Sequence, residues 1–222
     1  MGYQLLSHKL NAATPSYGGR ELFVMTRITD IKAGDSATNS RIETGVHVGT
    51  HVDLPAHFHV SGQTISSFPA DFWFFSNPLV LMVEPQNAVI RDELMDLLYQ
   101  LDADDNDLLL VKTGMGGLRE TEAYWRENIG FHPDVCDVVR TRLPQVRLFG
   151  FDSISVSSFT DRITGREAHR RFLDPCAPIL LLEDMDLSAV NETTKFKQVI
   201  VAPLFIESSE ALPCTVYGVT LD

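Results

Sequence analysis

Two short, uninterrupted apolar runs constrain most strongly what this chain can fold into. They read Leu-Leu-Leu-Val at 108–111 and Ile-Leu-Leu-Leu at 179–182. Runs of this length without polar alternation are typical of strands buried on both faces, as in sheets covered by helices. They fall far below the roughly 18 apolar residues of a membrane-spanning helix, so we expect no membrane partner.

Strand-like stretches alternate with amphipathic ones along the chain. We expect strands at 21–25, 44–48, 79–84, 108–113, 146–151, 178–183, 198–202 and 215–221. Helices are expected at 91–101, 133–143 and 164–173, the last with Thr164 and Glu167 in the spacing of a capping box. This interleaving, without a long linker or repeat, predicts a single α/β domain over residues 1–222, with a mixed, largely buried sheet and flanking helices.

Charge and cysteine content limit the function classes. The chain carries 18 basic and 30 acidic residues, a formal net charge of −12, which disfavours nucleic acid as a partner. Cys136, Cys176 and Cys214 lie far apart and fit neither a disulfide framework nor a zinc ribbon. Free thiols of this kind predict a reducing, cytoplasmic location.

Four of the seven histidines lie within 13 residues, at positions 47, 51, 57 and 59. His47, His51, Asp53 and His57 share sequence parity, so an extended chain projects them to one side. Imidazole and carboxylate donors together suit Zn²⁺, Mn²⁺, Fe²⁺ or Co²⁺. The pattern therefore predicts a metal site on extended chain, although each histidine alone is more often a satisfied core or surface residue. His59 has the same parity and is either a member or merely a neighbour.

Residues 47–58 match the signature H-x-G-T-H-x-D-x-P-x-H-F at every fixed position. In this the chain resembles the cyclase-like metal-dependent hydrolases, the family of bacterial kynurenine formamidase and isatin hydrolase. Weaker likenesses extend along most of the chain, at 6–8, 112–114, 150–153, 165–169, 179–183, 202–204 and 212–213. The resemblance implies a fold of the swivelling β/β/α type.

By the same resemblance, His47, His51 and Asp53 bind metal, and His169 and Glu183 are the distant ligands of a second ion. It implies one or two divalent ions, Zn or Mn, with Asp53 as the natural bridge if there are two. His57 is implied as the acid/base beside the metal. The residue pattern independently supports Glu183 as a metal ligand, because a carboxylate that ends an apolar run is costly to bury unless it meets a cation.

The implied activity is hydrolysis of an amide bond in a small aromatic substrate, either N-formylkynurenine-like or a cyclic amide. The resemblance also implies a homodimer or homotetramer. Two alternatives stay open: a cyclase or dehydratase in secondary metabolism, and a non-catalytic homologue that binds metal or ligand. The aromatic run at 68–75 either lines the substrate site or packs in the core or an interface. Thr215 stands where kynurenine formamidases tend to carry arginine, which leaves the exact substrate open.

Overall fold

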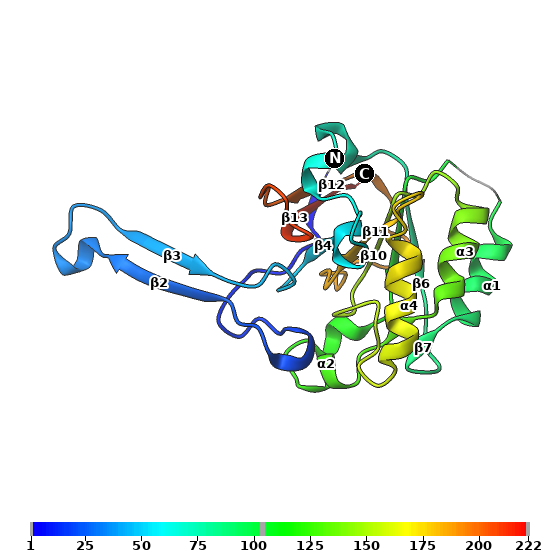
Figure 1. Ribbon diagram of the computed structural model, residues 1–222, viewed down its shortest axis with the longest axis horizontal. Coiled ribbons are helices and arrows are strands. Elements are labelled where there is room, and N and C mark those ends of the chain that lie inside the picture. Colours follow the sequence, from blue (N-terminus) through cyan, green and yellow to red (C-terminus); the bar gives the residue numbers. More distant parts are fainter. Residues whose placement is uncertain (1, 103–104, 221–222) are drawn as a thin grey trace.

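Within residues 2–102 and 105–220, which the computed structural model describes, nine strands form one mixed sheet (Figure 1). The strands join in the order β5-β12-β13-β4-β11-β10-β8-β6, and β1 also pairs with β13. Their bounds are β1 Gly2–Leu5, β4 His51–Asp53, β5 Phe74–Phe75, β6 Pro78–Met82, β8 Leu108–Lys112, β10 Leu148–Phe151, β11 Leu180–Glu183, β12 Phe196–Pro203 and β13 Ala211–Thr220. The predicted mixed sheet is confirmed.

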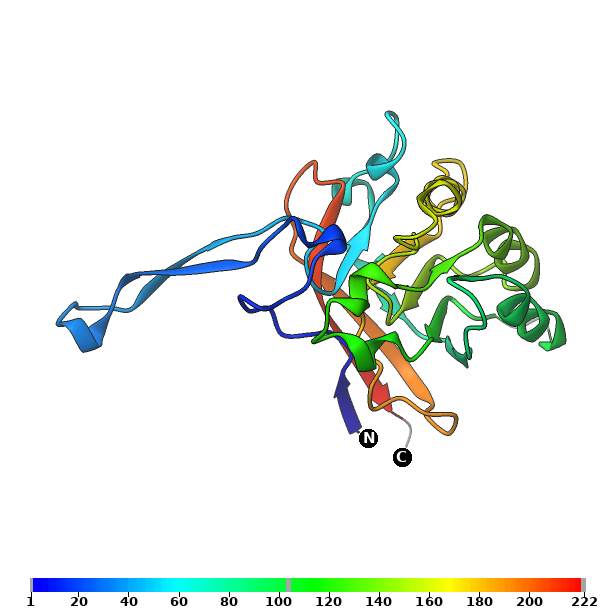
Figure 2. The ribbon, with the colours of Figure 1, turned by 90° about the horizontal axis from the view of Figure 1, so that it is seen from below.

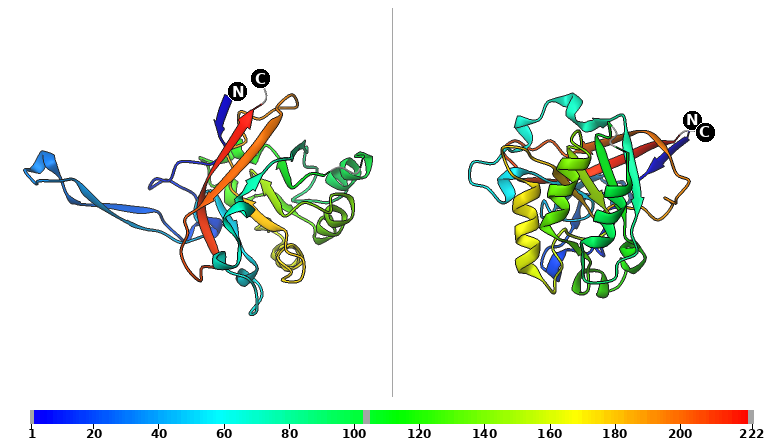
Figure 3. Two further views of the ribbon diagram at one scale, coloured as in Figure 1. Left: turned by 90° about the horizontal axis from the view of Figure 1, so that it is seen from above. Right: turned by 90° about the vertical axis from the view of Figure 1, so that its right-hand side faces the viewer.

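The four parallel strands β6, β8, β10 and β11 form the half of the sheet that helices cover. The helices are α1 Asp92–Gln100, α2 Ala123–Arg126, α3 Pro133–Arg142 and α4 Arg162–Phe172. Helices α1, α3 and α4 lie side by side over these strands (Figure 3). Phe172 of α4 stacks on Phe149 of β10 with ring centroids 5.0 Å apart. The apolar runs at 108–111 and 179–182 fall on β8 and at β11, and are buried as predicted.

Strand β4 joins the parallel half to an antiparallel half. It pairs antiparallel with β11 on one side and with β13 on the other. The register places His51 opposite Glu183, and Asp53 opposite Leu181. Two residues that are 132 positions apart in the chain therefore become neighbours through strand pairing alone.

A two-stranded hairpin extends away from the rest of the protein (Figures 1 and 2). Its strands are β2 Val24–Thr29 and β3 Asn39–Glu43, and most of their residues are exposed. The strand expected at 21–25 therefore starts later and runs further, and β3 has no counterpart among the expected strands. The two-stranded pair β7 Val89–Ile90 and β9 Gly130–Phe131 was also not expected.

Two sequence expectations are wrong in their local detail. Residues 44–48 are not a strand; the chain turns at 46–47, and Gly49 adopts the left-handed φ of 72° that favours glycine. The cap of α4 is Asp161, whose carboxylate accepts from the Thr164 backbone and hydroxyl, rather than a capping box of Thr164 and Glu167.

The aromatic run at 68–75 packs mainly into the core. Phe68, Trp73 and Phe75 are buried, and Phe72 contacts all three.

The last residue of the strand expected at 215–221 lies outside the described residues, and β13 covers the others. Within the described ranges, no helix is long and apolar enough to cross a membrane.

Candidate functional site

The signature segment is bent twice, once on each side of β4. Gly49, in its left-handed conformation, ends the turn that carries His47. After β4, Pro55 opens a short 3-10 turn, Pro55–His57, which lifts His57 back over the strand. Thr50 fixes the first bend, because its hydroxyl donates to the backbone oxygen of Asp184. His47 and His57 therefore reach the cluster from turns, whereas His51 and Asp53 share one side of β4, as the strand alternation predicts.

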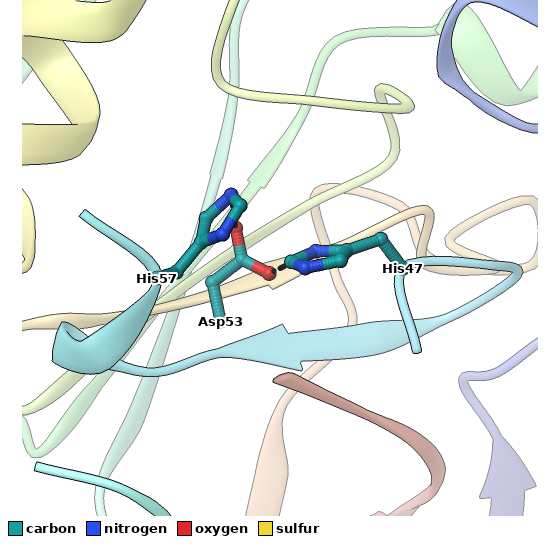
Figure 4. A group of neighbouring side chains, drawn as sticks. All are labelled: His47, Asp53 and His57. Atoms are coloured by element: carbon teal, nitrogen blue, oxygen red, sulfur yellow. Dashed lines mark ion pairs between the residues drawn. The ribbon is translucent and has the colours of Figure 1, made fainter. Parts of the chain in front are cut away.

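His47, Asp53 and His57 form one side of the resulting cluster (Figure 4). His47 Nδ1 lies 2.9 Å from Asp53 Oδ1, and His57 Nε2 lies 3.9 Å from Asp53 Oδ2. The His47 and His57 rings are 4.2 Å apart between centroids. All three side chains point toward one another, from the turn, from β4 and from the 3-10 turn (Figure 4). One ligand atom from each of the three lies within 4.8 Å of the others, so a single ion could contact all three.

His51, Asp53 and Glu183 form the other side. His51 Nε2 lies 3.3 Å from Asp53 Oδ1 and 3.5 Å from Glu183 Oε2. His169, on α4, brings its Nε2 to 3.6 Å from Asp53 Oδ2 and 3.7 Å from Glu183 Oε1. Its other ring nitrogen faces the Gly165 carbonyl at 2.9 Å, which holds the ring in place. Asp53 belongs to both sides of the cluster.

The buried atoms of this cluster fit a cation. His51 Nδ1 lies 2.8 Å from the Gly49 carbonyl, an acceptor only, so this nitrogen carries the proton and Nε2 presents a lone pair. That Nε2 and both oxygens of Asp53 are buried without a hydrogen-bond partner among the described residues. Lone pairs that face one another in the interior are costly unless a positive charge lies between them. Imidazole and carboxylate ligands suit Zn²⁺ and Mn²⁺ alike.

Burial and mutual charge shift the pKa values of the cluster in opposite directions. Burial and the adjacent Asp53 charge raise the pKa of Glu183 to about 8. Burial alone also raises the pKa of Asp53, but the charge of His47 and the close side-chain contacts with His169, His47 and His51 outweigh it and hold this pKa well below its usual range. Burial lowers the pKa of His57 to about 4, and the neighbouring histidines add to the effect. His57 is therefore neutral at pH 7 and can accept a proton.

A second buried network, which the sequence analysis did not find, fixes the end of β11. Asp184 follows Glu183 directly and has a left-handed φ of 52°. Its carboxylate accepts bonds of 2.8 and 2.7 Å from the Arg119 guanidinium and a third from the Tyr124 hydroxyl. A non-glycine residue keeps such a backbone conformation only where its surroundings enforce it. The network thereby sets the direction in which Glu183 leaves the strand.

The cluster opens into a cavity of about 320 Å³, a size that suits a small molecule. Tyr17, Phe58 and Ile154 give the cavity apolar walls. The Phe58 ring stacks on His169 with centroids 4.4 Å apart. The aromatic run at 68–75 contributes nothing to the lining, so the alternative that it lines the site does not hold within this chain.

The structure brings together every residue that the sequence analysis proposed for the site: His47, His51, Asp53, His57, His169 and Glu183. His59 is not among them. Its Nε2 lies 3.1 Å from the Arg170 carbonyl, so His59 bonds to the backbone of α4. Arg20, Arg162 and Arg166 also line the cavity and were missed. Arg20 lies in a loop that carries no motif, and on α4 the resemblance assigns a role to His169 alone.

Two proteins resemble this chain in sequence, one over most of its length and the other over about a third of it. It is 27% identical over 210 residues to a kynurenine formamidase of Salinibacter ruber, a match that covers 94% of this chain and 92% of that one. It is 37% identical over 73 residues to Cyclase-like protein 3 of Arabidopsis thaliana, which is 31% of this chain and 26% of that protein.

Solved structures show the same fold. Isatin hydrolase A of Labrenzia aggregata, bound to benzyl benzoate, superposes with a TM-score of 0.79 at 18% identity, covering 99% of this chain and 94% of that one. The Cyclase family, described as "Putative cyclase", matches residues 5–158, which is more than half of the chain. The chain therefore belongs to the Cyclase family.

Proposed function

We propose that this protein is a metal-dependent hydrolase that cleaves the amide bond of a small aromatic substrate, N-formylkynurenine-like or cyclic. The observation that carries the proposal is the buried cluster on both sides of Asp53, whose unpartnered nitrogen and oxygens face one another beneath a cavity with apolar walls. The kinship with a kynurenine formamidase and the fold of isatin hydrolase A support the same class.

His47, His51, Asp53, His169 and Glu183 are the proposed ligands of one or two ions. A divalent cation held there polarises an amide carbonyl and brings the pKa of a water molecule down to about 7. Each Asp53 oxygen faces one histidine from either side of the cluster, since Oδ1 faces His47 and His51, and Oδ2 faces His57 and His169. This arrangement supports Asp53 as a shared ligand.

His57 is the proposed proton-transfer group. It lines the cavity with about 29% of its side chain exposed, so a substrate can contact it. Being neutral at pH 7, it can take a proton from the attacking water and give it to the leaving nitrogen. Phe58 and Tyr17 exclude water from the walls and offer flat surfaces to an aromatic ring.

An assay with two substrates and two metals tests the proposal. N-formylkynurenine and isatin are followed by absorbance with the EDTA-treated protein, and again after addition of Zn²⁺ or Mn²⁺. We expect hydrolysis of at least one substrate only after metal is restored, and none by Asp53→Asn, which keeps the size of the side chain. Full metal occupancy by elemental analysis without hydrolysis of either substrate would overturn the proposal in favour of a cyclase, a dehydratase or a non-catalytic binder.

A further inference from the structure

Three arginines gather at the cavity without a counter-charge of their own. Arg20 follows the N-terminal 3-10 turn, and Arg162 and Arg166 lie one helical turn apart on α4. Among the described residues, no carboxylate oxygen lies within 4.0 Å of any of the three guanidinium groups. We call these three residues the arginine rim.

The contrast with the rest of α4 shows that the arginine rim is not a general property of this surface. Arg170 and Arg171, on the same helix, both pair with Glu167, at 3.9 and 3.4 Å. The protein as a whole has 30 acidic and 18 basic residues. Unpaired arginines gathered at one cavity of an acidic protein therefore point to an anion that is supplied from outside.

Arg162 is held ready for such an anion. Its guanidinium carbon lies 4.0 Å above the Phe159 ring. That ring packs edge-on against Trp125 at 5.3 Å and against Tyr17 at 5.6 Å, so the stack is fixed from both sides. Stacking uses the face of a guanidinium and leaves its edge for hydrogen bonds. Arg162 also contacts the Tyr17 hydroxyl, and its five N–H donors leave enough for two parallel bonds to a carboxylate.

The other charges of the cavity decide where an anion can bind. Asp53 and Glu183 are buried at the metal cluster, and Glu21 also lines the cavity. At the cluster the carboxylates offset the charge of the proposed cation, whereas the arginine rim keeps a positive charge that no described carboxylate pairs with. An anionic group of the substrate therefore belongs at the rim, and the amide to be cleaved belongs at the cluster.

We propose that the substrate of this enzyme carries a carboxylate, remote from the amide that is cleaved, which binds Arg162 and Arg166 of the arginine rim. The inference rests on the proposed hydrolase function. It narrows the substrate from any small aromatic amide to an acidic one, and makes the neutral cyclic amides poor substrates. Binding energy from such a remote group positions the reacting amide.

A binding experiment with one anionic and one neutral probe tests the arginine rim without any hydrolysis. 3-Phenylpropanoate and 3-phenylpropanamide, which differ in charge and little in size, are titrated by calorimetry into the wild-type protein, Arg162→Gln, Arg166→Gln and the control Arg170→Gln. We expect the wild type and the control to bind the acid about tenfold more tightly than the amide, a preference that weakens at high salt. Either rim variant should lose most of that preference.

Two results overturn the proposal. One is equal affinity of the wild type for both probes. The other is an acid preference that Arg162→Gln and Arg166→Gln both retain, since an acid that binds at the metal cluster is indifferent to the rim.

Hydrolysis separates this inference from the proposed function. The two substrates are 3-(2-formamidophenyl)propanoate and its primary amide, compared by the ratio of their kcat/KM values. We expect the ratio to favour the acid in the wild type and to fall about tenfold in Arg166→Gln. Cleavage of neither substrate, with the acid preference in binding intact, contradicts the hydrolase and leaves the rim standing. Cleavage of both at equal kcat/KM contradicts the rim and leaves the hydrolase.

Discussion

Replacing Glu183 by glutamine should make the metal-free protein more stable and weaken its metal binding. The Asp53 and Glu183 side chains are 1% and 3% exposed and converge on the same nitrogen of His51. Without a cation, ionising both is opposed by burial and by mutual repulsion. Glutamine keeps the shape, and its oxygen can still accept the 2.8 Å bond from the Val156 backbone.

The pKa of Glu183 gives the size of the effect and its pH dependence. The pKa rises from 4.5 to about 8 in the folded protein, so the folded state retains a proton that the unfolded chain has lost. The stability of the metal-free protein therefore falls as pH rises from about 4.5 to about 8. At about 1.4 kcal/mol per pKa unit, the loss is about 1 kcal/mol at pH 5 and about 4 kcal/mol at pH 8. Glu183→Gln escapes this loss.

Urea unfolding in EDTA at pH 5 and pH 8 measures the difference, with the exposed Glu192→Gln as the control. We expect Glu183→Gln to exceed the wild type by about 3 to 4 kcal/mol at pH 8 and by far less at pH 5. Zn²⁺ or Mn²⁺ at about 100 times the Kd should then add about 2.7 kcal/mol to the wild type, and much less to the variant. A variant that is no more stable at pH 8, or that metal stabilises equally, would refute the reasoning.

Three further predictions follow from the site and its surroundings. His57→Ala should keep most of the metal and lose about 10²–10⁴ in kcat, whereas Asp53→Ala should lose metal and activity together. Elemental analysis with kinetics on both checks this, and equal metal loss would make His57 a ligand. Native protein at pH 8 should react quickly with a thiol reagent only at the exposed Cys176, because burial raises the pKa of Cys136 to about 12 and also raises the pKa of Cys214; peptide mapping identifies the labelled thiol. Gly165→Ala should lower both activity and melting temperature, because its Cβ would lie 2.2 Å from a serine hydroxyl oxygen beside α4; circular dichroism and the hydrolysis assay measure these.

Burial was the part of the fold that the sequence predicted best. Strands such as β8 and β11 show their burial directly as apolar runs, and the three longer helices show it as a periodic apolar face. The turn at 44–48 was mistaken for a strand because it carries valine and threonine, and only the φ of Gly49 distinguishes the two. The single-domain assignment over 1–222 stays a prediction.

The site was predictable as a set of residues, and its geometry was not. Parity on an extended chain is correct for His51 and Asp53, which lie on β4, and wrong for His47 and His57, which reach Asp53 from turns. The juxtaposition of His51 and Glu183 depends on an antiparallel register between β4 and β11 that no local pattern specifies. Arg20 joins the cavity through tertiary packing of a loop, for which the sequence carries no periodic signal.

The β2–β3 hairpin affects how the mass of this protein has to be measured. A chain of 222 residues folded into a compact body has a radius of gyration of about 17 Å. A thin projection adds hydrodynamic drag out of proportion to its mass, so a monomer should elute early from a sizing column and imitate a larger assembly. The prediction of a homodimer or homotetramer should therefore be tested by measuring the molar mass with light scattering or sedimentation equilibrium. Shortening the hairpin at 30–38 should delay elution more than the lost mass alone explains.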